Sequence, residues 1–212
     1  MRHFLALAAI AVLAACNAPG AVAPPGPSDV AVQSSDVPKG VIKCDGSGSI
    51  DTFLNTIKTK DPSSYKSTSD EWDKAKADGA TAAAVVFYAD SKAHCTDITN
   101  SQNNNLSSAA YPVILNFVIQ FKDDKSAVQG YTSESIFGFS ESSLTTSGVT
   151  GVVKGTKTGL TENSAALTLA IGNQSFYVAV WQNKAFMVIL AVINVDTTQS
   201  KKIATNENGR IH

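Results

Sequence analysis

The stretch Ser175–Val195, SFYVAVWQNKAFMVILAVINV, decides the fold because it holds two apolar runs separated by a turn signal. The first run, Ser175–Gln182, is apolar at both of its alternating sets of positions, which is typical of a strand covered on both faces. Asn183 and Lys184 form a connection short enough for a tight turn, and Ala185–Val195 reads as the returning strand. We therefore predict an antiparallel hairpin in the interior of a sheet.

Four further segments are strand-like. Gly148–Lys154 and Ala165–Ile171 precede the hairpin, and Gly172 with Asn173 supplies a second short connection. Upstream, Ala82–Ala89 and Val113–Phe121 are rich in the β-branched and aromatic residues that favour strands.

Helical spacing of apolar residues predicts a helix over Ile50–Lys60, which Pro62 ends. A short second helix is expected from an N-cap at Ser69 to a stop at Gly79. Asp90 is expected to cap a helical turn that carries Cys95. Asp123 or Asp124 is expected to cap a helix running to about Tyr131. These elements together indicate a mixed fold of helices and strands.

The N-terminus has the parts of a bacterial secretory signal over residues 1–15, with a positive charge at Arg2 and an apolar stretch at Phe4–Leu13. The sequence Leu13-Ala-Ala-Cys16 resembles the lipobox at which lipoprotein signal peptides are cut. Lipidation of Cys16 would anchor the protein to a membrane through more than one acyl chain. An ordinary secretory signal with a chance cysteine is the alternative. The apolar stretch would span roughly 18 Å as a helix, too short for a permanent transmembrane anchor.

Residues 16–39 are expected to form the lipidated cysteine and a flexible tether, because five of the seven prolines fall there. Such a tether would hold the domain up to roughly 70 Å from the membrane. A proline-rich docking site is the rival interpretation. We expect the protein in the bacterial cell envelope, with its domain outside the cytoplasm. Asn17 does not supply the aspartate that retains lipoproteins at the inner membrane, so the cytoplasmic and outer membranes both stay open.

Residues 40–212 suit one globular domain. The chain has a net charge of −1 and 17% charged residues, and no basic cluster is denser than Lys201 and Lys202. That pattern argues against nucleic-acid binding.

Cys44 and Cys95 are the cysteines left once Cys16 is lipidated, and export favours a disulfide between them. Closing a loop of about 50 residues would stabilise the fold by roughly 4 kcal/mol on the chain-entropy model. The alternative is a catalytic thiol at Cys95 assisted by His94. Neighbours in sequence rarely present both side chains to one substrate, so the disulfide is favoured.

The segment Asp45–Asp51, DGSGSID, resembles the middle of an EF-hand calcium loop. Lys43 and Leu54 occupy the loop ends where carboxylates are needed, so we favour a turn in which Ser47 or Ser49 caps the helix that follows. The acidic pairs Asp70/Glu71 and Asp123/Asp124 fall at helix starts, where negative charge is stabilising. No cofactor, no metal site and no catalytic residue is expected.

A loose resemblance to known proteins is carried by Gly159–Ser164, by Phe176–Val180, and by Ala185–Val192 with a closing helix after it. These segments resemble small actinobacterial and related envelope lipoproteins and sensor ectodomains, over roughly residues 80–203. The resemblance implies an α+β fold of one domain, a sandwich in which helices pack on a curved antiparallel sheet. It implies no common reaction and supplies no site residue.

The leading hypothesis is a non-enzymatic envelope lipoprotein whose partner is an envelope protein or an apolar small molecule. As an apolar-ligand carrier, it would use a cavity lined by aromatic residues that otherwise simply fill the core. A hydrolase with an unrecognised site is a further alternative, favoured if His94 and a carboxylate converge in a polar pocket. The aromatic residues in question are Phe117, Phe121, Phe137, Phe139, Tyr177 and Trp181.

Overall fold

The computed structural model describes residues 24–100, 109–133, 140–146 and 150–212. The predicted signal peptide and the lipobox cysteine Cys16 lie outside these residues. Among the described residues, no helix is both long and apolar enough to cross a bilayer.

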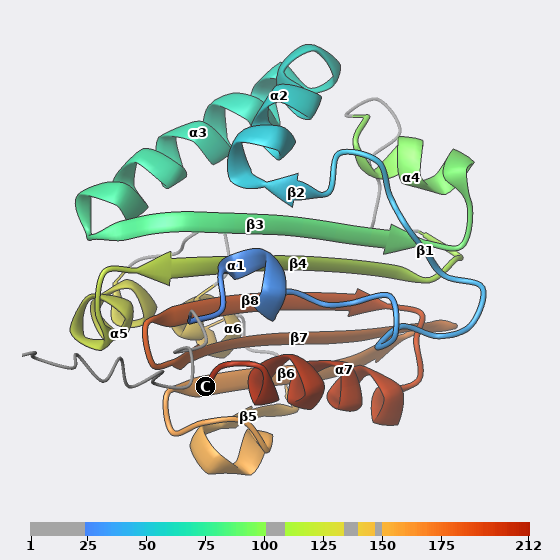
Figure 1. The fold of residues 1–212 in the computed structure, drawn as a ribbon. Coiled ribbons are helices and arrows are strands. Elements are labelled where there is room, and N and C mark those ends of the chain that lie inside the picture. Colours follow the sequence, from blue (N-terminus) through green and yellow to red (C-terminus); the bar gives the residue numbers. More distant parts are fainter. Residues whose placement is uncertain (1–23, 101–108, 134–139, 147–149) are drawn as a thin grey trace, which may run out of the picture.

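A single antiparallel sheet of eight strands organises the domain, in the order β1-β3-β4-β8-β7-β6-β5 with β2 also paired to β3 (Figure 1). Both predicted hairpins are present, since β6 pairs with β7 and β7 pairs with β8. The predicted fold class, α+β with helices packed on an antiparallel sheet, is confirmed. The strands are β1 (Ile42–Lys43), β2 (Gly48–Ser49), β3 (Ala80–Ala89), β4 (Val113–Phe121), β5 (Val152–Lys154), β6 (Ser164–Ile171), β7 (Gln174–Asn183) and β8 (Phe186–Ile193).

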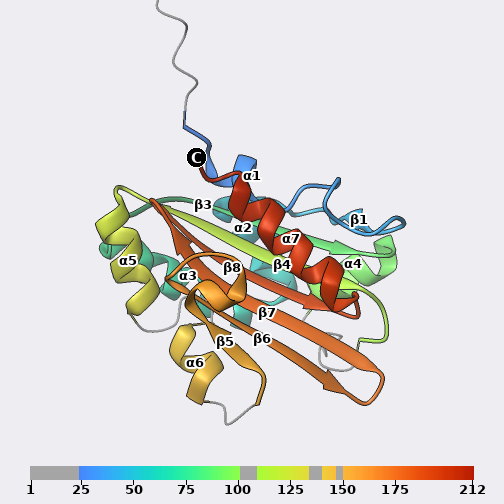
Figure 2. The same cartoon turned by 90° about the horizontal axis from the view of Figure 1, so that it is seen from below.

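Alternate residues of each strand face opposite sides of the sheet, and two separate hydrophobic clusters result. We call the side that carries Phe87 and Ile189 the pocket face, and the side that carries Tyr88 and Leu190 the strap face. On the pocket face lie α2 (Ile50–Lys60), α3 (Pro62–Ala77), α4 (Lys92–Ile98), α5 (Asp124–Thr132) and α6 (Glu141–Thr146). On the strap face lie α1 (Pro27–Val30) and α7 (Thr197–Gly209) (Figure 2).

The first helix of the pocket face follows the sequence prediction, since α2 begins and ends where the apolar spacing places it. The next helix does not. It begins at Pro62, seven residues before the predicted N-cap Ser69, because the Asp61 side chain accepts a hydrogen bond from the Ser64 amide and proline fits a first helical turn. Ser69 therefore lies inside α3. The predicted stop at Gly79 is correct, with a φ of 100° that favours glycine.

The capping residues of the two later helices were predicted in part. Ser91, rather than Asp90, caps α4, and its hydroxyl accepts a hydrogen bond from the His94 amide. Asp123 caps α5, which ends at Thr132, one residue beyond the predicted end. Gly130 lets α5 approach the sheet closely, because a Cβ there would lie 2.4 Å from the Phe121 ring.

The predicted tether is wrong in its second half. Residues 26–37, which we call the strap, form α1 and a short irregular segment that ends in a turn, and Val30, Ala31 and Val32 are at most 1% exposed. Consecutive apolar residues following the prolines give this segment burial that offsets its ordering entropy. The predicted domain boundary at Gly40 therefore lies too late in the chain.

Hydrogen bonds fix the strap between the sheet and α7. The Val32 amide donates to Asn116 Oδ1 at 3.0 Å, and the Tyr88 hydroxyl donates to the Val32 carbonyl at 2.8 Å. Arg210, the C-cap of α7, donates from Nε to the Val30 carbonyl at 2.9 Å, and its guanidinium pairs with Asp36 at 2.9 Å. The N-terminal and C-terminal ends of the domain are thus joined through one buried network.

Candidate functional site

An apolar cavity lies on the pocket face between the helix layer and the sheet. We call it the inner pocket; its volume is about 120 Å³. Helix α2 supplies one wall, β3 and β4 supply the floor, and the end of α4 supplies the other wall. The apolar side chains that line it include Phe53, Ile57, Phe87, Ile98, Leu115 and Phe117.

Three phenylalanines give the inner pocket its shape. The Phe53 ring lies edge-on to both Phe87 and Phe117, with ring centroids 6.0 Å apart in each pair and interplanar angles of 70° and 89°. Edge-to-face packing of this kind holds the rings in fixed orientations. For scale, a dry engineered cavity of about 150 Å³ binds benzene. The inner pocket is apolar and smaller than that cavity, so its volume limits an occupant to about one aromatic ring or a short alkyl group.

Asp61 is the charged residue in the lining of the inner pocket. Its carboxylate accepts hydrogen bonds from the Ser63 and Ser64 hydroxyls and from the Ser64 amide. Hydrogen bonds from Ser64 and Ser63 hold the pKa of Asp61 below its ordinary value even though burial raises it. The carboxylate is thus ionised and already satisfied by its own helix, which suits a capping role and gives no proton-transfer site.

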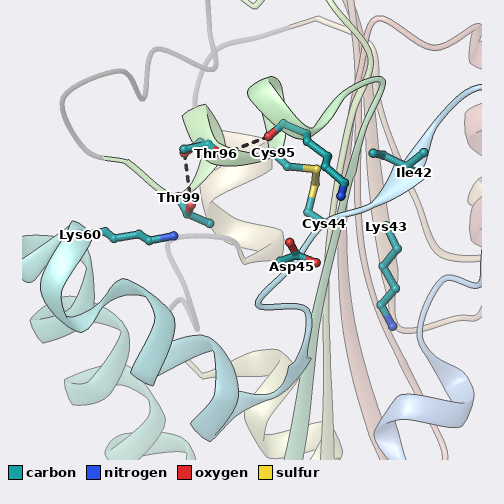
Figure 3. Close-up of a pocket in the computed structure, with 9 residues that line it drawn as sticks. Ile42, Lys43, Cys44, Asp45, Lys60, Cys95, Thr96 and Thr99 are labelled. Atoms are coloured by element: carbon teal, nitrogen blue, oxygen red, sulfur yellow. Dashed lines mark hydrogen bonds between the residues drawn. A yellow bond between two sulfur atoms is a disulfide. The ribbon is translucent and has the colours of Figure 1, made fainter.

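A second hollow, the outer pocket, adjoins the inner pocket at Thr99 and has a volume of about 240 Å³ (Figure 3). Its lining is polar and includes Lys60, Asp45 and Thr96. Figure 3 shows Lys60 extending across the hollow toward Thr99, whereas Lys43 points away. The Thr96 and Thr99 hydroxyls donate to backbone carbonyls of α4. The two pockets together offer an apolar interior beside a polar rim.

The predicted disulfide between Cys44 and Cys95 is confirmed and forms one wall of the outer pocket. It fastens the segment after β1 to α4, with the two Cα atoms 5.3 Å apart. Because Cys95 is in this bond, it has no thiol to act as a nucleophile beside His94. The disulfide instead fixes the position of α4, whose last residues line the inner pocket.

His94 does approach a carboxylate, as the hydrolase alternative requires, but not in a pocket. Its Nδ1 contacts Asp90 Oδ1 one helical turn away, and its ring stacks on Tyr111 with centroids 3.5 Å apart. His94 is absent from the lining of both the inner and the outer pocket. This arrangement supports packing of α4 and does not favour a hydrolase.

The segment that resembles a calcium loop serves as a turn. The Ser49 side chain caps α2 by accepting from the Thr52 amide, as predicted for Ser47 or Ser49. The Ser47 hydroxyl bonds both the amide and the carbonyl of Phe87. Within the described ranges, no group of three or more His, Cys, Asp or Glu residues is arranged to hold a metal ion.

The aromatic residues proposed for a carrier cavity do not share one cavity. Phe117 and Phe121 lie on the pocket face, whereas Tyr177 and Trp181 lie on the strap face. Phe137 and Phe139 lie outside the described residues. Phe117 alone of the described four lines the inner pocket. The sheet register separates them: Phe117 aligns with Ile189 and Ile189 with Val180, so Val180 shares the face of Phe117. Trp181, the next residue along β7, therefore points to the opposite face.

Sequence reasoning missed Phe53 and Phe87 as site residues. Phe53 falls within the helix predicted over Ile50–Lys60 and Phe87 within the strand predicted over Ala82–Ala89, but neither pattern shows that the two rings meet. The sequence pattern that could have identified them is an aromatic residue on the apolar face of a helix together with one at a core-facing position of a strand that packs against that helix.

Comparisons with known proteins give little beyond this geometry. No protein-family model matches the chain, and no curated protein sequence matches it. Among solved structures, the extracellular domain of PknH from Mycobacterium tuberculosis aligns with 12% sequence identity and a TM-score of 0.43, covering 89% of this chain and 97% of that chain. A similarity at that level establishes neither a shared family nor a shared function.

Proposed function

We propose that this protein is a lipid-anchored lipoprotein of the bacterial envelope, whose domain binds an apolar group of a ligand in the inner pocket and catalyses no reaction. The anchoring part of the proposal rests on the lipobox that ends at Cys16. The disulfide between Cys44 and Cys95 supports an oxidising compartment, where such bonds persist.

The inner pocket is the observation that carries the binding function. Binding sites for small molecules are concave and mostly apolar, with a few polar groups at their rim, and this pocket has that composition. Its volume of about 120 Å³ is small, so it accommodates one ring or one short alkyl segment of a larger ligand. The polar outer pocket adjoins it and leaves room for the rest of such a molecule.

Toluene is a suitable first probe for the binding function, because it is uncharged and close to the inner pocket in size. The mature sequence from Asn17, exported by a conventional secretory signal, would be titrated while the δ1 methyl resonances of Ile57 and Ile98 are followed by NMR. We expect saturable shifts of both methyl groups, since both residues line the inner pocket. The methyl group of Ile203, buried on the strap face, should not shift.

A matched pair of substitutions distinguishes binding in the inner pocket from nonspecific binding of toluene to other apolar regions. Leu115→Phe adds bulk to the floor of the inner pocket and should abolish the toluene shifts. Leu160→Phe makes the same change beside the strap-face cluster and should leave them intact. Unchanged Ile57 and Ile98 resonances in saturating toluene would contradict the binding proposal.

The anchor is tested separately by growth with an alkyne-bearing fatty acid. The wild-type chain should incorporate the label and fractionate with membranes. The Cys16→Ser variant should remain unlabelled, because it lacks the thiol that receives the lipid. Equal labelling of the two chains would exclude Cys16 as the lipidation site.

A further inference from the structure

The position of the strap restricts how the domain can sit on a membrane. Eight residue steps separate Cys16 from Pro24, the first described residue. In an extended, polyproline-like conformation, eight steps reach about 25 Å. That reach is far shorter than the roughly 70 Å expected if residues 16–39 were all flexible.

The chain enters the domain on the strap face. Figures 1 and 2 both show the segment leading into α1 beside the C-terminal end of α7. The bonds from Arg210 to the Val30 and Ala31 carbonyls, at 2.9 and 3.1 Å, hold this entry point in place. Because the strap is held in place, the lipid anchor at Cys16 must lie within reach of the strap face of the sheet.

The inner pocket lies on the other face, beneath α2. A helix layer on each side of a sheet gives a thickness of about 30 Å, since a helix is about 10 Å across and packs about 10 Å from the sheet. If the pocket face lay on the bilayer, the tether would have to extend from the strap face past the full thickness of the domain to reach the membrane. A tether that reaches about 25 Å cannot do so. Turning the domain over would require the strap to leave its buried position.

We infer that the strap face is the surface that rests toward the lipid bilayer, and that the inner pocket opens toward the aqueous side and takes its ligand from there. The inference rests on the lipid anchor at Cys16 in the proposed function. Charge does not contribute to it, because the exposed Lys201 and Lys202 of α7 are matched in number by Asp196 at the N-cap of that helix and Asp29 of α1. The orientation rests on the entry point of the chain and the reach of the tether.

Two threonine positions give a matched test of this orientation. Thr59 in α2 is exposed on the pocket face and Thr205 in α7 is exposed on the strap face. Thr59→Cys and Thr205→Cys chains, lipidated and with the native disulfide oxidised, would each carry one thiol-linked fluorophore. They would be reconstituted into vesicles of phosphatidylcholine and phosphatidylglycerol containing a lipid with a nitroxide headgroup.

We expect the nitroxide lipid to quench the fluorophore at position 205 several-fold more than the one at position 59. A flexible insertion of twenty Gly and Ser residues between Pro19 and Gly20, which lengthens the reach of the tether, should reduce that difference. Equal or reversed quenching on vesicles that retain the protein would overturn the orientation while leaving the anchor in place. Failure of the lipidated chain to bind vesicles would overturn the anchor and the orientation together.

Discussion

The strap face buries polar groups that are hydrogen-bonded to one another, whereas the pocket face buries aliphatic and aromatic side chains and contains a cavity. On the strap face, Asn116 is fully buried and bonds the Val32 amide, the Ile189 carbonyl and Glu207. On the pocket face, the ring of Phe53 packs edge-to-face with Phe87 and Phe117 beside the inner pocket.

The difference reflects what each face has to hold. Hydrogen bonds have fixed partners and directions, so the buried network on the strap face specifies one position for the strap and α7. Apolar contacts are non-directional and roughly proportional to area, so the pocket face can leave a gap beneath α2 and remain folded. The strap and the inner pocket are thus placed on opposite sides of one sheet.

The largest effect should come from removing the strap. A chain that begins at Gly40 loses the burial of Val30, Ala31 and Val32 and leaves Arg210 without Asp36. We expect it to lose more than about 5 kcal/mol of unfolding free energy, or not to fold at all. A chain that begins at Pro24 should match the mature chain in urea unfolding followed by circular dichroism. Equal midpoints for all three chains would show that the strap contributes nothing.

Removing the disulfide on the pocket face should have the next largest effect. The double substitution Cys44→Ser and Cys95→Ser opens a bond between residues 51 positions apart. On the chain-entropy model the loss of unfolding free energy is about 4 kcal/mol, and measured losses are often smaller. Urea unfolding gives the value. The toluene shifts at Ile98 should also weaken, because the disulfide positions α4. If the variant loses stability but binds toluene as strongly as the wild type, the disulfide acts only by restricting the unfolded chain and does not position α4.

The strap face should respond to pH through Glu207, which is fully buried and whose Oε2 has no hydrogen-bond partner. Burial raises the pKa of Glu207 well above its ordinary value; the hydrogen bond from Asn116 and the charge of Arg210 offset this in part, and Asp36 adds to it. Burial also raises the pKa of nearby Tyr177 to about 12, so that hydroxyl stays neutral.

Since the folded pKa of Glu207 lies above the unfolded one, its stabilising contribution is complete below pH 4.5 and is lost as pH rises toward the folded value. Glu207→Gln removes this titration. The stability of the variant relative to wild type should therefore increase with pH, by up to about 1.4 kcal/mol per pH unit. Urea midpoints between pH 4 and 8 measure it, and parallel pH profiles for the two chains would contradict a buried, titrating Glu207.

The smallest effect should come from the cap of α3 on the pocket face. Asp61→Ala removes the acceptor for the Ser63 and Ser64 hydroxyls and the Ser64 amide, and we expect a loss of about 1 kcal/mol. Because the folded pKa of Asp61 is depressed, its contribution is present above pH 3.8 and is lost as pH falls through the folded value. In thermal unfolding, the difference in melting temperature between wild type and Asp61→Ala should therefore be smaller at pH 2 than at pH 7. Asp61→Asn keeps a capping oxygen and should lose less stability than Asp61→Ala.

Much of the pocket face was accessible to sequence reasoning because its signals are local. Apolar spacing located α2 to the residue, and the export signal, with Cys16 assigned to lipidation, left one cysteine pair to form the disulfide. The start of α3 was missed because Pro62 serves equally to end one helix and to open the next. The inner pocket was missed because a cavity is set by how well separate elements fit, which no pattern within one element records.

The sequence alone determined the hairpins, most of the strands and the class of fold, because alternation, turn residues and caps act between neighbours in the chain. Only the tertiary structure decided that the strap is ordered and buried and is not part of a flexible tether. Val32 meets Asn116 across 84 positions, Asn116 meets Glu207 across 91, and Arg210 meets Val30 across 180. A proline-rich segment is flexible or ordered according to whether such distant partners bury it, since its own residues offer too little hydrogen bonding and burial to fix one conformation.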